Sequence, residues 1–127
     1  MYAIQMSELE QEVMDIIWNL KEAQIRDVQE KMQTKKNLAY TTIATIFSRL
    51  EHKGLLTKNI QGSAYLYKPK ISKEIYSKSV AKSFLGKFIS FYGSIAISSF
   101  AESIRDLPEN KKKYLLELLE AEKNDKQ

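Results

Sequence analysis

Short polar side chains gather on one face of residues 40 to 53, a segment whose apolar residues have helical spacing. Thr41, Thr42 and Thr45 lie near its start, and Arg49 adds a longer hydrogen-bond donor one turn later. Threonine can donate or accept a hydrogen bond and can offer its methyl group to thymine, which suits base edges in the DNA major groove. The expected DNA-contacting residues of this segment are Tyr40, Thr41, Thr42, Thr45, Ser48 and Arg49.

These side chains divide into two expected roles. Thr42 and Thr45 are predicted to read bases, whereas Tyr40, Ser48 and Arg49 can also reach sugar or phosphate groups. A polar helix face can also be simply solvated, so its surroundings must decide.

Positive charge is confined to the middle of the chain, although the net charge is only +4. Residues 35–70 contain seven basic residues and one acidic residue, whereas residues 1–34 contain three basic and seven acidic residues. A basic segment of this kind can displace counterions from a phosphate backbone, and it could equally meet an acidic protein surface.

Three helices are predicted in the first half of the chain, over residues 7–20, 25–33 and 40–53. Ser7 and Glu10 have capping-box spacing at the first of them. Gly54 can end the third helix, whose core-facing residues are Ile43, Ile46, Phe47 and Leu50.

A β-hairpin is predicted next, because residues 55–59 and 64–68 are rich in β-compatible residues around Gly62. Three helices followed by a hairpin predict a winged helix-turn-helix domain over residues 1–70, in a mainly α protein. Tyr65 and Tyr67 alternate, so one of them should pack on the core. The wing residues expected to hold the DNA backbone are Lys58, Ser63, Tyr65 and Lys68.

Residues 71–127 are predicted to form a three-helix dimerisation domain. A helix over residues 72–92 ends at Gly93, a short helix follows, and Pro108 opens a final helix. Three helices with this much apolar surface can hardly bury it alone, so a homodimer is expected. The apolar stripe Tyr76-Val80-Phe84-Phe88 of the first of these helices could instead line a ligand pocket. The predicted dimerisation residues are Tyr76, Val80, Phe84, Phe88, Phe100, Ile104, Leu115, Leu118 and Leu119.

Several classes of function find no support in the composition. The chain has no cysteine and a single histidine, His52, so no metal centre or cofactor site is expected. No nucleophile, base and orienting group form a catalytic pattern, which argues against an enzyme. No membrane-spanning stretch or cleavable leader is recognised, so a cytoplasmic protein is expected.

Two segments resemble the penicillinase-repressor family of winged-helix regulators, the BlaI, MecI and CopY type. The first is Ser7-x-x-Glu10-x-x-Val13-Met14-x-Ile16-Ile17-Trp18, and the second is Thr41-Thr42-Ile43-x-Thr45-x-x-x-Arg49-Leu50-x-x-Lys53-Gly54. A looser similarity continues through Tyr65-Leu66-Tyr67-Lys68-Pro69 and Ala81-Lys82-x-Phe84-Leu85. The resemblance implies a homodimeric repressor that binds a palindromic operator through positions matching Thr41, Thr42 and Thr45.

The resemblance also implies a release signal. Members of the BlaI and MecI type are inactivated by cleavage before a phenylalanine in an Asn-Phe-Ala context, after a membrane sensor-protease is activated. The matching residues here are Ser99, Phe100 and Ala101, with serine in place of asparagine. The cysteine pair that binds metal in CopY-type members is absent.

The leading hypothesis is therefore a sequence-specific repressor that acts as a two-fold dimer on an inverted-repeat operator. Inactivation by cleavage at Ser99-Phe100 is a separate hypothesis, which rests on the Ser99-Phe100-Ala101 match alone. A winged-helix module that binds an acidic protein and a regulator that binds a small effector are the alternatives.

Overall fold

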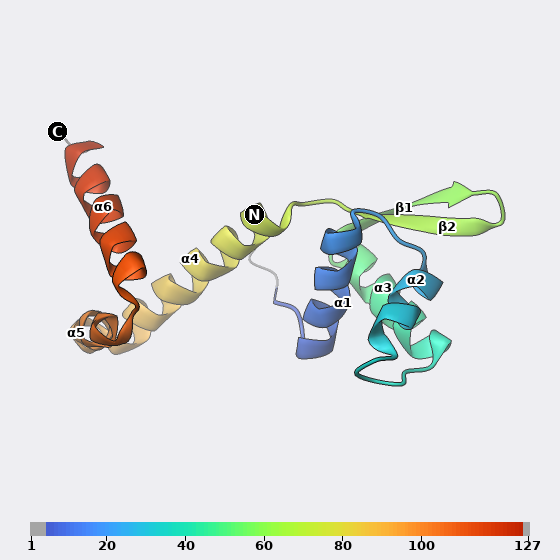
Figure 1. Cartoon of the computed structure of the whole chain (residues 1–127), viewed down its shortest axis with the longest axis horizontal. Coiled ribbons are helices and arrows are strands. Elements are labelled where there is room, and N and C mark those ends of the chain that lie inside the picture. The colour runs from blue at the N-terminus through green and yellow to red at the C-terminus, as the bar shows by residue number, and fades with distance from the viewer. Residues whose placement is uncertain (1–4, 126–127) are drawn as a thin grey trace. The chain divides into compact units, whose positions relative to one another are not determined.

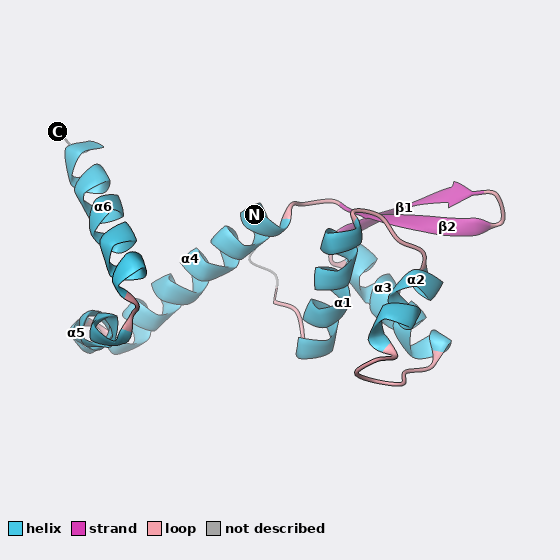
Figure 2. Cartoon of the chain, viewed as in Figure 1, coloured by secondary structure: helices cyan, strands magenta, loops and turns pink. Residues whose placement is uncertain are grey.

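The computed structural model describes residues 5–125, which form two compact units, residues up to 83 and residues from 84. The first unit contains α1 (Glu8–Leu20), α2 (Ile25–Met32), α3 (Tyr40–His52), β1 (Leu56–Gln61) and β2 (Ala64–Pro69). Helix α4 (Lys73–Tyr92) begins in the first unit and ends in the second, which continues with α5 (Ser94–Ser103), η1 (Ile104–Asp106) and α6 (Glu109–Asp125). Figures 1 and 2 show this order of elements, which confirms the predicted fold class.

The predicted capping box begins α1. The Ser7 hydroxyl oxygen accepts a hydrogen bond from the Glu10 N–H at 3.2 Å, and the Glu10 carboxylate accepts one from the Ser7 N–H at 2.8 Å. Two backbone donors that the helix itself cannot satisfy are thereby satisfied.

The core of the first unit forms where α1, α2 and α3 meet the hairpin. Phe47 of α3 is fully buried, and its ring meets that of Tyr67 from β2 edge-on at 4.7 Å between centroids. The predicted inner face of α3 is confirmed, since Ile43, Ile46, Phe47 and Leu50 are all buried. The other large buried side chains of this core are Val13, Met14, Ile17, Val28, Met32, Leu55, Leu56, Ile71 and Tyr76.

The hairpin is joined to the helices by a short backbone bridge. Ala23, in the connection between α1 and α2, exchanges two hydrogen bonds with Tyr67, of 2.9 and 2.8 Å. Tyr67 is therefore buried while Tyr65 is exposed, which confirms that one of the two tyrosines packs on the core. Gly62 has a φ of 64° in the two-residue turn, a left-handed conformation that favours glycine.

The first turns of α4 pack on the first unit. The Trp18 ring lies 5.7 Å from that of Tyr76, and the Trp18 indole N–H donates to the Ile71 carbonyl at 2.9 Å. Tyr76 is only 4% exposed, and Val80 packs against the same core. Tyr76 was predicted as a dimerisation residue, but burial within its own chain leaves it almost no surface for a second copy. The units accordingly divide after residue 83, whereas the hairpin ends near the expected boundary at residue 70.

The second unit exposes most of its apolar side chains. Ala96 is the one buried residue among residues 84–125, whereas Phe84 is 64% and Phe91 is 81% exposed. The rings of Phe84, Phe88 and Tyr92 follow one another along α4, with successive centroids 6.1 and 5.3 Å apart. Gly93 separates α4 from α5 with a φ of 60°, and Pro108 precedes the first residue of α6. Within the described part of the chain, no helix has both the length and the apolar character to cross a membrane.

Candidate nucleic-acid interface

The outer face of α3 carries the predicted DNA-contacting side chains. Burial of the opposite face in the core turns this face to solvent, and all six predicted residues of α3 are exposed. Ala39 precedes the helix and provides no side-chain cap, so the first N–H groups of α3 keep their capacity to bind an anion. The exposed residues are Tyr40, Thr41, Thr42, Thr45, Ser48 and Arg49.

Thr45 already uses its hydroxyl proton within the helix. Its Oγ1 donates a hydrogen bond to the Thr41 carbonyl at 2.9 Å, a common arrangement for threonine four residues beyond its acceptor. The oxygen can still accept a hydrogen bond, and the methyl group has no such engagement. Thr45 can therefore make an apolar contact or accept a hydrogen bond, but it cannot donate one to DNA without losing its bond to Thr41.

The two wing lysines lie close to carboxylates. Lys58 Nζ is 3.7 Å from Glu51 Oε1, and it also lies 4.6 Å from the centre of the Tyr65 ring. Lys68 Nζ is 3.5 Å from Glu22 Oε2. Exposed pairs at these distances are weak, so both lysines can exchange a carboxylate for a phosphate at small cost.

Two arginines on the first unit have no such partner. Among residues 5–125, neither Arg49 nor Arg26 has a carboxylate within ion-pair distance. Arg49 lines a shallow hollow at the end of α3 with Ser48, His52 and Lys53. Arg26 is not among the predicted DNA-contacting residues, although its position at the start of the predicted helix over residues 25–33 is a signal in the sequence for an anion contact.

The predicted interface residues fall into separate groups. Tyr40, Ser63 and Tyr65 line one hollow between the start of α3 and the hairpin, together with residues of α2. Ser48 and Arg49 lie further along α3, beside the hollow at its end.

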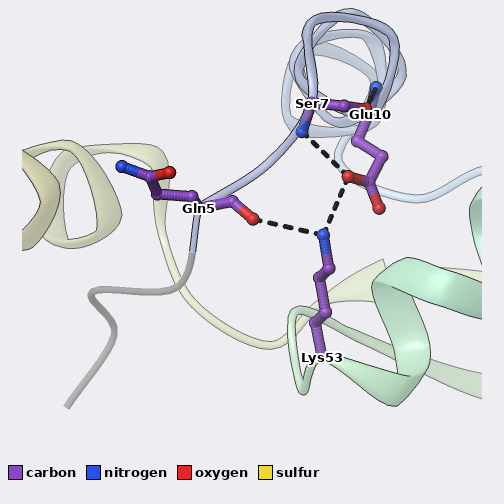
Figure 3. A network of polar contacts seen from close by, with 4 residues as sticks. All are labelled: Gln5, Ser7, Glu10 and Lys53. Carbon is purple, nitrogen blue, oxygen red and sulfur yellow. Dashed lines mark hydrogen bonds and ion pairs between the residues drawn. The ribbon is translucent and has the colours of Figure 1, made fainter.

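An ion pair ties the end of α3 to the start of α1. Lys53 Nζ lies 2.8 Å from Glu10 Oε1 and donates a second hydrogen bond to the Gln5 carbonyl at 3.1 Å, as Figure 3 shows. The Glu10 residue is only 4% exposed, and within the described structure its Oε2 atom has no hydrogen-bond partner. The pair therefore joins the end of α3 to the start of α1. Without the ammonium group of Lys53, the buried Glu10 carboxylate would have no cation beside it.

Burial and hydrogen bonding shift the pKa of Glu10 in opposite directions, and the effect of the hydrogen bonds is the larger. Burial alone would raise this pKa, but the hydrogen bonds from Lys53 and from the Ser7 backbone outweigh it and lower the pKa below its ordinary value of 4.5. A lowered pKa in the folded state contributes stability above the unfolded-state value and loses it as the pH falls through the folded-state value.

The remaining predicted sites lie in the second unit. Ser99 and Phe100 are exposed and stand within α5, and Phe84, Leu118 and Leu119 are exposed apolar residues. Phe88, Ile104 and Leu115 are partly buried. Over residues 5–125, no three acidic or histidine side chains gather in a group that could hold a metal ion.

Three helices, a hairpin and an exposed polar face on the third helix define a winged helix-turn-helix protein. The family model for the penicillinase repressor matches residues 6–121. The chain therefore belongs to the penicillinase repressor family.

Individual relatives agree with this assignment. The chain is 29% identical to the penicillinase repressor of Bacillus licheniformis over 122 residues, covering 96% of this chain and 94% of that protein. It is 37% identical to the transcriptional regulator BlaI of Mycobacterium tuberculosis over 65 residues, which are 50% of this chain but only 47% of that relative. The solution structure of the B. licheniformis BlaI monomeric form in complex with the blaP half-operator has a TM-score of 0.50 and 30% identity, and covers 58% of this chain and 90% of that one.

Replacing Lys53 tests the ion pair. Lys53→Met leaves the Glu10 carboxylate buried without its cation, and we expect a loss of about 1–3 kcal/mol in the free energy of unfolding at neutral pH. Urea denaturation should show this deficit shrinking as the pH is lowered past 4.5, because protonation of Glu10 removes the uncompensated charge.

The matched control is Lys36→Met, which removes the partner of Glu12 in an exposed pair. We expect that control to change the free energy of unfolding by no more than about 0.5 kcal/mol at any pH. Equal deficits in the two variants, or a Lys53→Met deficit that is constant with pH, would contradict the assigned role of the pair.

Proposed function

We propose that this protein is a DNA-binding transcriptional repressor in which α3 enters the major groove of an operator. The observation that carries the proposal is the exposed outer face of α3, which has three threonines and Arg49 opposite a buried inner face. Among residues 5–125, Arg49 has no carboxylate at ion-pair distance. Family membership and the similarity to a BlaI structure in complex with a half-operator support the same function.

The hairpin would hold the DNA backbone beside that helix. Lys58 and Lys68 would exchange their weak carboxylate partners for phosphates, which contributes affinity for any sequence. The alternative is a winged-helix module for an acidic protein partner. Such a module would show no preference among DNA sequences.

Thr45 is proposed to read a thymine methyl group, because its hydroxyl proton is engaged by Thr41. Thr45→Val keeps the methyl and removes the hydroxyl, so it should preserve the ratio of operator to random-duplex affinity within about twofold. Thr45→Ser keeps the hydroxyl and removes the methyl, so the ratio should fall by about fivefold or more, corresponding to about 1 kcal/mol. Fluorescence anisotropy with an operator selected by the wild-type chain from a random library measures both.

The reverse order, with the valine variant impaired and the serine variant intact, would assign the reading to the hydroxyl instead. Lys58→Ala serves as the comparison for non-specific contact. It should weaken binding to all sequences and reduce its salt dependence.

The second unit is proposed to form a homodimer. Its exposed apolar side chains include Phe84, Phe91 and Leu119, and Ala96 is the one buried residue among residues 84–125. A single copy thus leaves most of its apolar surface in water, and a second copy could cover it. A two-fold dimer presents two copies of α3, so the operator should be an inverted repeat with half-sites about one or two helical turns apart. Tyr76 is left out of the proposed dimer face because it is buried in the first unit.

Phe84→Asp should convert the dimer to a monomer at micromolar concentration, since it places a charge in the proposed apolar contact. Sedimentation equilibrium gives the mass of each variant. Ile60→Asp is the control, because Ile60 is 70% exposed on the hairpin and lies outside the second unit. A wild-type monomer, or a Phe84→Asp variant that remains a dimer, would contradict this face.

The proposed release signal is cleavage between Ser99 and Phe100 by a membrane sensor-protease system. This bond lies inside α5, where the Phe100 carbonyl also accepts a hydrogen bond from the Ser103 hydroxyl at 2.7 Å. Proteases bind extended segments, so α5 has to open locally before it can be cut. Incubation with the cognate protease, followed by intact-mass analysis, should give two fragments that join at this bond. An uncut chain, or fragments that end at another bond, would contradict the proposal.

A further inference from the structure

A polar hollow of about 370 Å³ lies between the start of α2, the start of α3 and the tip of the hairpin. It joins residues already assigned to DNA contact with residues of α2 that have no assigned role. The residues that line it are Gln24, Ile25, Arg26, Tyr40, Ser63, Ala64 and Tyr65.

Arg26 is the charged residue of this hollow. Its side chain is exposed, and within residues 5–125 it has no carboxylate at ion-pair distance. The neighbouring carboxylate of Asp27 instead accepts a hydrogen bond from the Gln24 N–H at 2.8 Å, where it closes a capping box. The guanidinium group is therefore free to bind an anion through its paired N–H donors.

The other side chains around the hollow are suited to the same anion. Tyr40 and Tyr65 are 49% and 47% exposed, so both rings are accessible, and Ser63 adds a hydroxyl at the hairpin turn. Lys58 Nζ lies 4.6 Å from the centre of the Tyr65 ring, so a second cation lies beside one of the lining residues. Among the residues that the structure describes, no carboxylate lines this hollow.

Another hollow beside α2 has the reverse character. It is lined by Leu20, Glu22, Asp27, Glu30 and Lys31, so three carboxylates surround its single lysine, and we call this part of the helix the acidic flank. An anion is repelled from the acidic flank and attracted to the hollow around Arg26. The contrast also provides a matched control on one helix.

We propose that the hollow around Arg26 binds one phosphodiester of the operator backbone, at the point where the DNA passes from α3 to the wing. The inference rests on the proposed DNA-binding function and extends the interface to α2. Arg26 holds the phosphate by charge and by hydrogen bonds, while Tyr40, Ser63 and Tyr65 contact the same sugar-phosphate unit. Contacts of this kind fix the position of a protein on the duplex without reading its sequence.

The first experiment measures how DNA affinity depends on salt for two charge-removing variants of α2. Arg26→Ala should lower the affinity for operator and random duplex alike, and should reduce the slope of log affinity against log salt by about one. Lys31→Ala removes the same charge from the same helix, but on the acidic flank, and should leave the slope unchanged within about 0.3 of a unit. Equal slopes for both variants would overturn the proposal.

The second experiment locates the phosphate itself. Methylphosphonate groups, which carry no charge, replace the operator phosphates one at a time. A methylphosphonate at one position should weaken binding by the wild type about tenfold but should not weaken binding by Arg26→Ala any further. This is the coupling expected of two groups in contact. Additive losses at every position would overturn the proposal.

A free anion could in principle use the same donors, and a thermal melt separates the two sources. The change in Tm on adding inorganic phosphate at constant ionic strength is measured for the wild type and for Arg26→Ala. The two changes should differ by no more than about one degree. A larger rise confined to the wild type, with unchanged DNA binding by Arg26→Ala, would assign the hollow to a free anion and overturn the backbone assignment.

The proposed function and this inference fail in different ways. A wild-type chain that binds all duplexes equally would contradict the repressor proposal. A wild-type chain that prefers its operator, together with unaltered slopes in Arg26→Ala, would contradict only the role of Arg26. Arg26 is exposed, and a circular dichroism melt that matches the wild type confirms that any change in binding is not caused by unfolding.

Discussion

The packing of the inner face of α3 is the constraint on which the remainder of the first unit depends. Phe47 lies at the centre of that face, fully buried against the Tyr67 ring. Because successive residues of a helix are about 100° apart, burial of one face fixes which residues face outward. The same contact draws β2 onto α3, and the bridge from Ala23 to Tyr67 then joins the hairpin to the connection before α2. The four buried residues of α3 together set the rotation of the helix, and the contact between Phe47 and Tyr67 places the hairpin against it.

Local sequence patterns predicted the elements of this unit well. The capping box of Ser7 and Glu10, the apolar face of α3 and the turn at Gly62 all act over a few residues, so their spacing in the sequence is sufficient. Boundaries differed by one or two residues, as at β1, which extends to Gln61.

Contacts between distant residues could not be predicted in the same way. Glu10 and Lys53 are 43 residues apart, and nothing in their local patterns indicates that they form an ion pair. Tyr76 continues the apolar spacing of α4, yet it packs on Trp18 rather than on the residues further along its own stripe. Periodicity shows which face of a helix is apolar but not which partner covers each turn. Sums of charge along the sequence do not show ion pairs either. Lys58 and Lys68, in the basic segment, each have a carboxylate within ion-pair distance, whereas Arg26, in the acidic segment, has none at that distance among residues 5–125.

In the proposed homodimer, assembly of the second unit would be part of its folding. With Ala96 as the one buried residue among residues 84–125, apolar burial within a single copy can contribute little to its stability. In the proposed dimer the missing burial comes from the partner, so the helices and the dimer would be stable only together. A cut within α5 would then remove α6 and part of α5 from both the fold and the contact. Operator affinity would fall because each α3 would have to bind its half-site alone, which costs the gain in effective concentration that a linked pair provides.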